Sequence, residues 1–205
     1  MKIDLLTFNL ITVSRVKIRK IISYLKKGGL IIYPTETAYA LGCDAMNKDA
    51  VLKVFLLKKR LNAKTLPLIA GDIGIVKRFA YINGVVEKFA RKFWPGPLTL
   101  ILKARKKFPT GVMNQKGEIA IRVSGNSFAR NISKKLNHPI ISTSANLSGR
   151  ETAYSLNKVI KQFGKNRLQN VLLVDGGRIP RRKVSTIARV NNNKVEILRK
   201  GAVKI

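Results

Sequence analysis

Short apolar runs that end in small polar residues are the feature of this sequence that most constrains its fold. "LIIY" is followed by "PTET", "VLLV" by "DGG", and "HPIIS" by "TSANLSG". Such runs are typical of buried strands, and Ser, Thr, Asn and Gly are ordinary turn residues. Open α/β sheets bind ligands where their strands end, so polar turns that follow several strands favour a shared site over chance.

Helical periodicity fills most of the gaps between these runs. The spacing of apolar residues predicts helices over residues 13–27, 47–60, 73–79, 85–93, 127–136 and 156–163. Further strands are predicted at "LPLIA", "LTLILKA" and "EIAIRV", and "VSTIARV" with "KVEILRK" predicts a hairpin closed by "NNN".

Several pairs of predicted strands have no helix between them, which argues against a purely parallel sheet. We therefore expect an α/β fold in which a twisted, open sheet of mixed parallel and antiparallel strands has flanking helices. The length of 205 residues and the absence of a recognisable linker predict a single domain over residues 1–205.

Composition limits the kinds of chemistry that are open to the chain. One cysteine and one histidine exclude an internal disulfide framework and most His-rich metal sites, and they favour a cytoplasmic protein. No apolar run is long enough to span a bilayer. The net charge of +31 favours phosphate-bearing partners, although many of the lysines are equally well explained as surface solvation in a Lys-, Asn- and Ile-rich sequence.

Five lysine and arginine residues lie at or near the predicted ends of helices and strands. Lys58 and Arg60 close the second predicted helix, Lys64 follows in the loop, and Arg122 and Arg199 end two strands. Cations at a helix C-terminus are favoured by the helix dipole alone. Arginine also suits phosphate because its planar donors bind in a bidentate way. Taken together, these residues predict a cradle for several negative charges.

Other nucleotide motifs and catalytic pairs are absent. Neither GxxxxGK[ST] nor GxGxxG occurs, so the sequence supports neither a P-loop nor a Rossmann site. A hydrolase with paired carboxylates would have to use Glu36, Asp44 or Asp175, and nothing in the sequence pairs them.

The motifs "YPTETAYALGCDA", "LKKR", "WPGPLTLIL", "IAIRV", "STSANLSG", "STIARV" and "ILRKGA" occur in this order. In this combination the chain resembles the YrdC-like threonylcarbamoyl-AMP synthase family, in its short single-domain bacterial form. The resemblance implies an enzyme that makes threonylcarbamoyl-adenylate from L-threonine, bicarbonate and ATP and releases pyrophosphate. The product would supply N6-threonylcarbamoyladenosine in tRNA, at the position next to the anticodon, through downstream transfer proteins.

The resemblance also implies roles for single residues. Threonine would be held by Thr37, Arg122, Ser142 and Ser185. ATP would be held by Arg60, Lys64, Ser144, Asn146 and Arg199, and Lys58 and Arg60 would act in catalysis at the phosphates. Mg²⁺ would bind mainly through the phosphates of ATP.

The sequence departs from the family pattern at two places. Ala40 stands where the family usually has glycine, and the loop over residues 150–154 lacks the usual prolines, so no ligand role is carried over to it. Two alternatives remain open. A non-catalytic RNA-binding protein could use a basic concave face, and a carbamoyl-transfer maturation domain would need zinc-finger-like and acylphosphatase-like segments for which this chain has no room.

Overall fold

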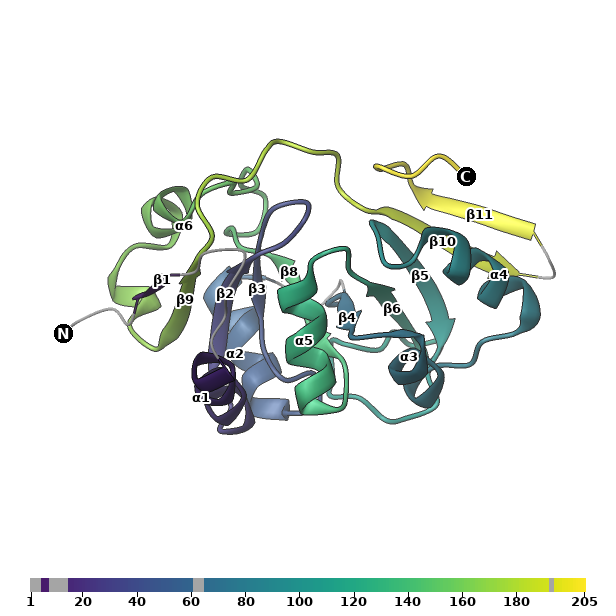
Figure 1. The fold of residues 1–205 in the computed structure, drawn as a ribbon, viewed down its shortest axis with the longest axis horizontal. Coiled ribbons are helices and arrows are strands. Elements are labelled where there is room, and N and C mark those ends of the chain that lie inside the picture. Colours follow the sequence, from purple (N-terminus) through teal and green to yellow (C-terminus); the bar gives the residue numbers. More distant parts are fainter. Residues whose placement is uncertain (1–4, 8–14, 61–64, 192–193) are drawn as a thin grey trace.

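A computed structural model describes residues 5–7, 15–60, 65–191 and 194–205, and the described strands form two mixed sheets (Figure 1). The first sheet has the order β1-β9-β2-β3-β8, with β1 (Leu5–Thr7), β2 (Leu30–Pro34), β3 (Tyr39–Gly42), β8 (Thr143–Ser144) and β9 (Val171–Asp175). In it, β9 runs parallel to β1 and β2, whereas β3 is antiparallel to both β2 and β8.

The second sheet has the order β11-β10-β5-β6-β4-β7. Its strands are β4 (Leu68–Ala70), β5 (Leu98–Lys103), β6 (Glu118–Val123), β7 (Ile140–Ile141), β10 (Thr186–Asn191) and β11 (Lys194–Arg199). The predicted α/β fold with mixed strand directions is confirmed, and so is the antiparallel pairing of β10 with β11.

The strands form two sheets where the sequence predicts one. The division falls at Ser142, which lies between β7 in the second sheet and β8 in the first. "PIISTS" therefore does not run as one strand into a turn, because its two halves pair with different neighbours. β7 pairs with β4, and β8 pairs with β3.

Six α-helices lie in the described ranges, together with one short 3₁₀ turn, Asn166–Leu168. Asn47, Asp72, Asn83, Asn126 and Ser155 each cap a helix by accepting a hydrogen bond from a backbone N–H of its first turn, which explains where these helices begin. The α-helices are α1 (Arg15–Lys26), α2 (Lys48–Lys58), α3 (Ile73–Phe79), α4 (Gly84–Phe93), α5 (Ser127–Leu136) and α6 (Leu156–Phe163).

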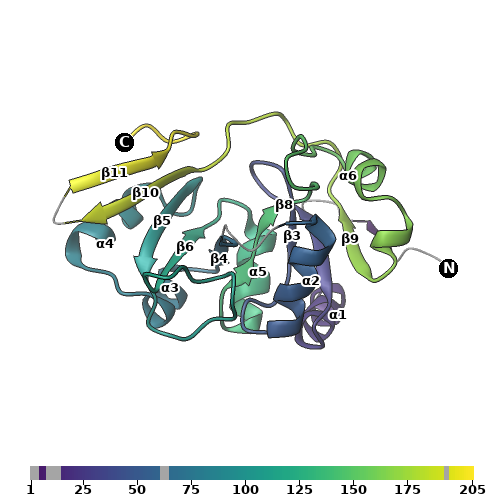
Figure 2. The same cartoon turned by 180° about the vertical axis from the view of Figure 1, so that it is seen from behind.

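The helices cover the strands from both sides. α1 and α5 lie together on one side, and α2 lies on the other (Figures 1 and 2). Ile21, Leu25 and Ile132 pack against Ile31 and Tyr33 in one apolar cluster. A larger cluster joins α2, α3, α4 and α6 to both sheets, so the two sheets share a continuous core. None of the helices in the described ranges combines the length and the apolar content needed to cross a membrane.

Gly42 allows the crossing segment to pack against the first sheet. A Cβ atom at Gly42 would lie 2.5 Å from the carbonyl oxygen of Ile141 and 2.9 Å from a ring carbon of Tyr33. The crossing segment is also tied to this strand end, because the N–H of Ile141 donates to the carbonyl of Cys43 at 2.9 Å. The close approach of the two backbones therefore depends on the missing side chain.

We expect Gly42→Ala to lower the free energy of unfolding by about 1–3 kcal/mol, because the backbone of Ile141 must move to admit a methyl group. Urea denaturation measures this loss. Gly84→Ala is the matched control, since nothing lies within 4 Å of its added Cβ and alanine is the better helix former. Equal stability of the two variants would contradict the packing argument.

Candidate functional site

A cavity of about 660 Å³ is lined by residues of both sheets and of the segment that crosses between them. Its size lies within the range usual for ligand sites in proteins, which is roughly 300–1,000 Å³. Seven of the residues predicted from the sequence line it, namely Thr37, Arg60, Arg122, Ser142, Ser144, Ser185 and Arg199. The structure therefore shows that segments distant in the sequence converge on one cationic cavity.

The serine-rich segment reaches the cavity because it crosses from one sheet to the other. The N–H of Ser142 donates to the carbonyl of Pro67 at 2.9 Å, and Ser144 pairs with Ala40 of β3. Ser142, Thr143 and Ser144 all line the cavity. Ala40, which stands where the family usually has glycine, also lines the cavity.

Lys58 lies behind this segment and does not line the cavity. Its side chain is buried, with 2% of the residue exposed, and Nζ donates to the carbonyls of Ser144 at 2.5 Å and Asn146 at 2.7 Å. Burial and the nearby charge of Arg60 lower the pKa of Lys58 to about 7. Lys58 thus holds the backbone of the serine-rich turn, and its sequence-based role at the phosphates stays a prediction.

Asn146 also supports the turn from outside the cavity. Its amide nitrogen donates to the carbonyls of Leu147 at 2.9 Å and Arg150 at 2.6 Å. Its Oδ1 is buried and has no hydrogen-bond partner among the described residues. The proposed contact of Asn146 with ATP therefore stays a prediction, and its observed contacts are those of a residue that shapes the turn.

Arg60 enters the cavity because the helix ends before it. α2 stops at Lys58, and Lys59 adopts the left-handed conformation with φ 49°, which turns the chain away from the helix axis. The guanidinium of Arg60 donates to the carbonyl of Thr65 at 3.0 Å, and partial burial lowers its pKa. Lys64, the other cation predicted for this loop, lies outside the described residues.

Arg199 is fixed at the end of the hairpin by Ser185. Its Nη2 donates to the carbonyl of Ser185 at 2.7 Å and to the hydroxyl at 2.9 Å, and Thr99 donates to the same hydroxyl at 3.0 Å. Burial and the nearby charge of Arg122 lower the pKa of Arg199. Two guanidinium groups are thus held close enough to repel one another, an arrangement that a bound anion would stabilise.

The hydroxyl groups at the other wall have defined partners. The buried Tyr33 donates its phenolic proton to Ser142 Oγ at 2.9 Å, so Ser142 keeps its own hydrogen for a further acceptor. Thr37 Oγ1 lies 3.2 Å from Thr35 Oγ1. These groups offer both donors and acceptors to a polar ligand.

Several polar lining residues were not identified from the sequence. Thr99 lies in β5, Thr65 follows the loop after α2, and Thr152 lies in the loop whose sequence departs from the family pattern. A single threonine within an apolar strand does not indicate a binding site from the sequence, because β-branched residues are common in strands. Thr35, Asn114 and Thr143 also belong to this set.

Comparison with known proteins places the chain in a family. The family model Sua5_yciO_yrdC, described as telomere recombination, matches residues 23–201. The chain belongs to the Sua5/YciO/YrdC family.

Relatives in the Sua5/YciO/YrdC family include proteins named threonylcarbamoyl-AMP synthase. The protein of Idiomarina loihiensis is 40% identical over 141 residues, which cover 67% of this chain and 76% of the relative. The protein of Thiobacillus denitrificans is 32% identical over 174 residues, which cover 84% of this chain and 90% of the relative.

Solved structures of the Sua5/YciO/YrdC family share the fold. P. abyssi Sua5 complexed with L-threonine has a TM-score of 0.87 at 27% identity, over 96% of this chain. This chain spans 57% of the length of that protein. E. coli YciO has a TM-score of 0.85 at 24% identity, over 98% of this chain and 96% of that chain.

The pKa of Lys58 makes stability depend on pH. The folded pKa of about 7 lies below the ordinary value of 10.5, so above pH 7 the unfolded chain binds a proton that the folded chain does not. Stability therefore rises with pH between pH 7 and 9, by up to about 1.4 kcal/mol per pH unit from this group. We expect urea denaturation to show a smaller rise of the unfolding free energy with pH for Lys58→Met than for the wild-type protein. Lys59→Met, at an exposed neighbouring position, should keep the wild-type slope, and parallel slopes for all three proteins would contradict this account.

Proposed function

We propose that this chain is a threonylcarbamoyl-AMP synthase, which joins L-threonine, bicarbonate and ATP and releases pyrophosphate. The observation that carries the proposal is the cavity in which Arg60, Arg122 and Arg199 meet the hydroxyl groups of Ser142 and Ser144. Relatives that share this name over most of their length support it. A non-catalytic RNA-binding role receives no such support from the relatives.

The threonine end of the cavity is the part around Arg122. Its guanidinium suits the substrate carboxylate, and Thr37, Ser142 and Ser185 offer small donors and acceptors for the hydroxyl and amine. The related P. abyssi protein was solved with L-threonine, which supports an amino acid as one ligand.

The nucleotide end contains the remaining cations. Arg60 and Arg199 suit the phosphates, Ser144 lies in the lining beside them, and Lys64 is proposed to join them. The donors of the cavity are hydroxyl, amide and guanidinium groups, so the phosphates would supply most ligands of a Mg²⁺ ion. The ion would neutralise negative charge on the triphosphate.

The reaction would proceed by positioning and electrostatic stabilisation. The threonine amine adds to bicarbonate with loss of water and forms a carbamate. A carbamate oxygen then attacks the α-phosphorus, the bond to the β-phosphate oxygen breaks, and pyrophosphate leaves. Arg60 and Arg199 would stabilise the charge that develops on the phosphoryl oxygens and the leaving group. No step requires a side-chain nucleophile, which agrees with the complete burial of Cys43.

The product would serve the formation of N6-threonylcarbamoyladenosine in tRNA, through downstream proteins that transfer the threonylcarbamoyl group. A cytoplasmic location is proposed with this role, since that is where tRNA modification of this kind would find its substrate.

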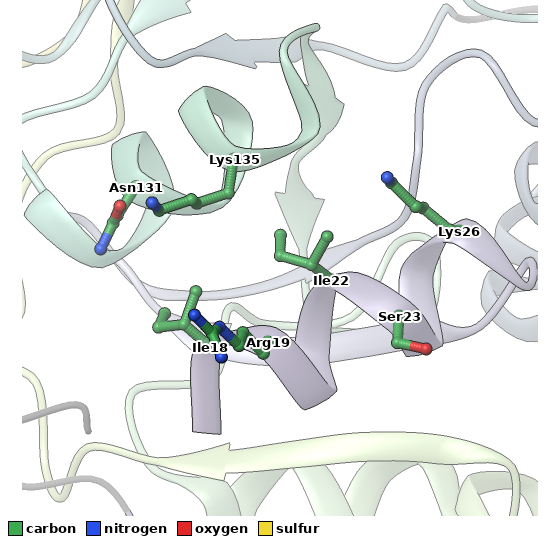
Figure 3. A pocket seen from close by; sticks show the side chains of 7 residues that line it. All are labelled: Ile18, Arg19, Ile22, Ser23, Lys26, Asn131 and Lys135. Atoms are coloured by element: carbon green, nitrogen blue, oxygen red, sulfur yellow. The ribbon is translucent and has the colours of Figure 1, made fainter. Parts of the chain in front are cut away.

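A second cavity favours a separate contact with RNA. It measures about 720 Å³ and lies between α1 and α5, where Arg19 and Lys26 of α1 and Lys135 of α5 project around Ile22 (Figure 3). Within the described ranges no carboxylate pairs with these three cations. Unpaired cations along a groove suit the phosphate backbone of RNA.

The synthase activity is tested by incubating the protein with ATP, threonine and bicarbonate and measuring pyrophosphate. We expect release to require all three substrates. Arg60→Ala should lower the rate about 10²–10³-fold, because it removes a positioned donor from the phosphates. Arg91→Ala, at an exposed position of α4, is the matched control and should keep the wild-type rate. Wild-type turnover by Arg60→Ala would refute the phosphate role.

Binding of unmodified tRNA tests the groove between α1 and α5. Replacing Lys26 and Lys135 by Glu should weaken binding and lower the slope of log affinity against log salt by about one for each lost phosphate contact. Lys88 and Lys161 are exposed on other helices, so their joint replacement by Glu controls for net charge. An equal loss in both double variants would show that RNA follows total charge and does not use the groove.

A further inference from the structure

Glu36 stands next to the cavity but does not line it. It lies between Thr35 and Thr37 in the turn from β2 to β3, and both of these threonines line the cavity. Its carboxylate points instead toward the end of β6, where Oε2 accepts a hydrogen bond from Ser124 Oγ at 2.6 Å. Its Oε1 lies 3.4 Å from Nη1 of Arg122. Both side chains are largely buried, with exposed fractions of 16% for Glu36 and 10% for Arg122.

The polar contacts of Arg122 are few in the described part of the chain. Within the described part of the chain, its guanidinium makes no hydrogen bond, and Glu36 is its ion-pair partner. Arg199 lies close enough to repel it. A guanidinium that has five N–H donors and a like charge nearby has no fixed direction unless an anion holds it.

Burying the Glu36 carboxylate costs hydration free energy, so its buried position needs an explanation. Its Oε1 is buried and has no hydrogen-bond partner in the described residues, and the guanidinium of Arg122 lies 3.4 Å from it. A buried ion pair contributes little net stability, because the loss of hydration offsets the attraction. The pair is therefore better explained by what it does to Arg122 than by what it adds to the fold.

We propose that Glu36 is a positioning residue, which holds the Arg122 guanidinium toward the cavity so that its remaining N–H groups meet the carboxylate of the amino-acid substrate. This inference rests on the proposed threonine site. It adds a residue that would touch none of the three substrates and would act through Arg122.

The protonation state of Glu36 agrees with this role. Burial alone raises the pKa of its carboxyl, but the charge of Arg122 and the hydrogen bond from Ser124 outweigh burial, so the pKa lies below its ordinary value. Glu36 is thus ionised at neutral pH and neutralises one guanidinium. Arg60 and Arg199 lack a carboxylate partner among the described residues, so their charge remains for the phosphates. The pair would divide the cavity into an amino-acid end and a polyphosphate end.

Glu36→Gln tests the proposal, because it keeps the shape of the side chain and removes the charge that orients Arg122. We expect the Kd for threonine from calorimetry, and the KM for threonine from pyrophosphate release, to rise about tenfold. The KM for ATP should change by less than about twofold. Glu36→Asp, which keeps the charge on a shorter side chain, should recover part of the loss. Glu87→Gln on α4 removes a carboxylate far from Arg122 in the sequence and should leave both constants unchanged.

The outcomes separate this inference from the proposed function. If the wild-type protein releases no pyrophosphate with all three substrates, the proposed function fails. If the wild-type protein is active and Glu36→Gln keeps the wild-type KM for threonine, or raises both KM values equally, the positioning role is wrong. Should Glu36→Gln not fold, Ser124→Ala removes the hydrogen bond to the carboxylate and must raise the threonine KM alone, and an unchanged KM in that variant overturns the proposal.

Discussion

The crossing of the chain from one sheet to the other at Ser142 is the constraint on which the cavity depends. β7 belongs to the second sheet and β8 to the first, so one residue joins the two. The crossing has to be extended and has to pass close to β3, which is possible because Gly42 has no side chain. Lys58 holds the same segment from behind through two backbone carbonyls. Ser142 and Ser144 of this segment therefore line a cavity to which both sheets contribute.

Charge is the second organising principle of the site. Three guanidinium groups converge there, and among the described residues a carboxylate, that of Glu36, pairs with Arg122 but not with Arg60 or Arg199. Burial lowers the pKa values of Arg60 and Arg199, and the charge of Arg122 lowers that of Arg199 further, so the charged forms of these side chains are disfavoured at this place. A polyanion would offset that effect on binding. The uneven distribution of negative charge would thus separate the proposed places for a zwitterion and for a triphosphate.

The sequence allows many residues of the site to be predicted, but it does not show which of them line the cavity and which support it from behind. Arg122 and Arg199 are recognisable because a charged residue ends an apolar strand, and both line the cavity. Lys58 and Arg60 are two residues apart, and no sequence pattern shows that the helix ends between them. The left-handed conformation of Lys59 directs Arg60 into the cavity and leaves Lys58 behind the turn. Likewise, the split into two sheets depends on which neighbours β7 and β8 pair with, and pairing partners are distant in sequence.

The hydroxyl groups of the cavity are held by partners inside the core, and this is what suits the site to chemistry without a nucleophile. Tyr33 donates to Ser142 from within the cluster that packs α1 and α5 against the first sheet, and Thr99 donates to Ser185 from β5. These donors orient the hydroxyl groups of Ser142 and Ser185, so little reorganisation of these two groups would be needed when charge develops during the proposed reaction. In the proposed reaction the core would contribute in this way, because the buried phenol of Tyr33 occupies an acceptor position of Ser142 and leaves the serine proton for another acceptor.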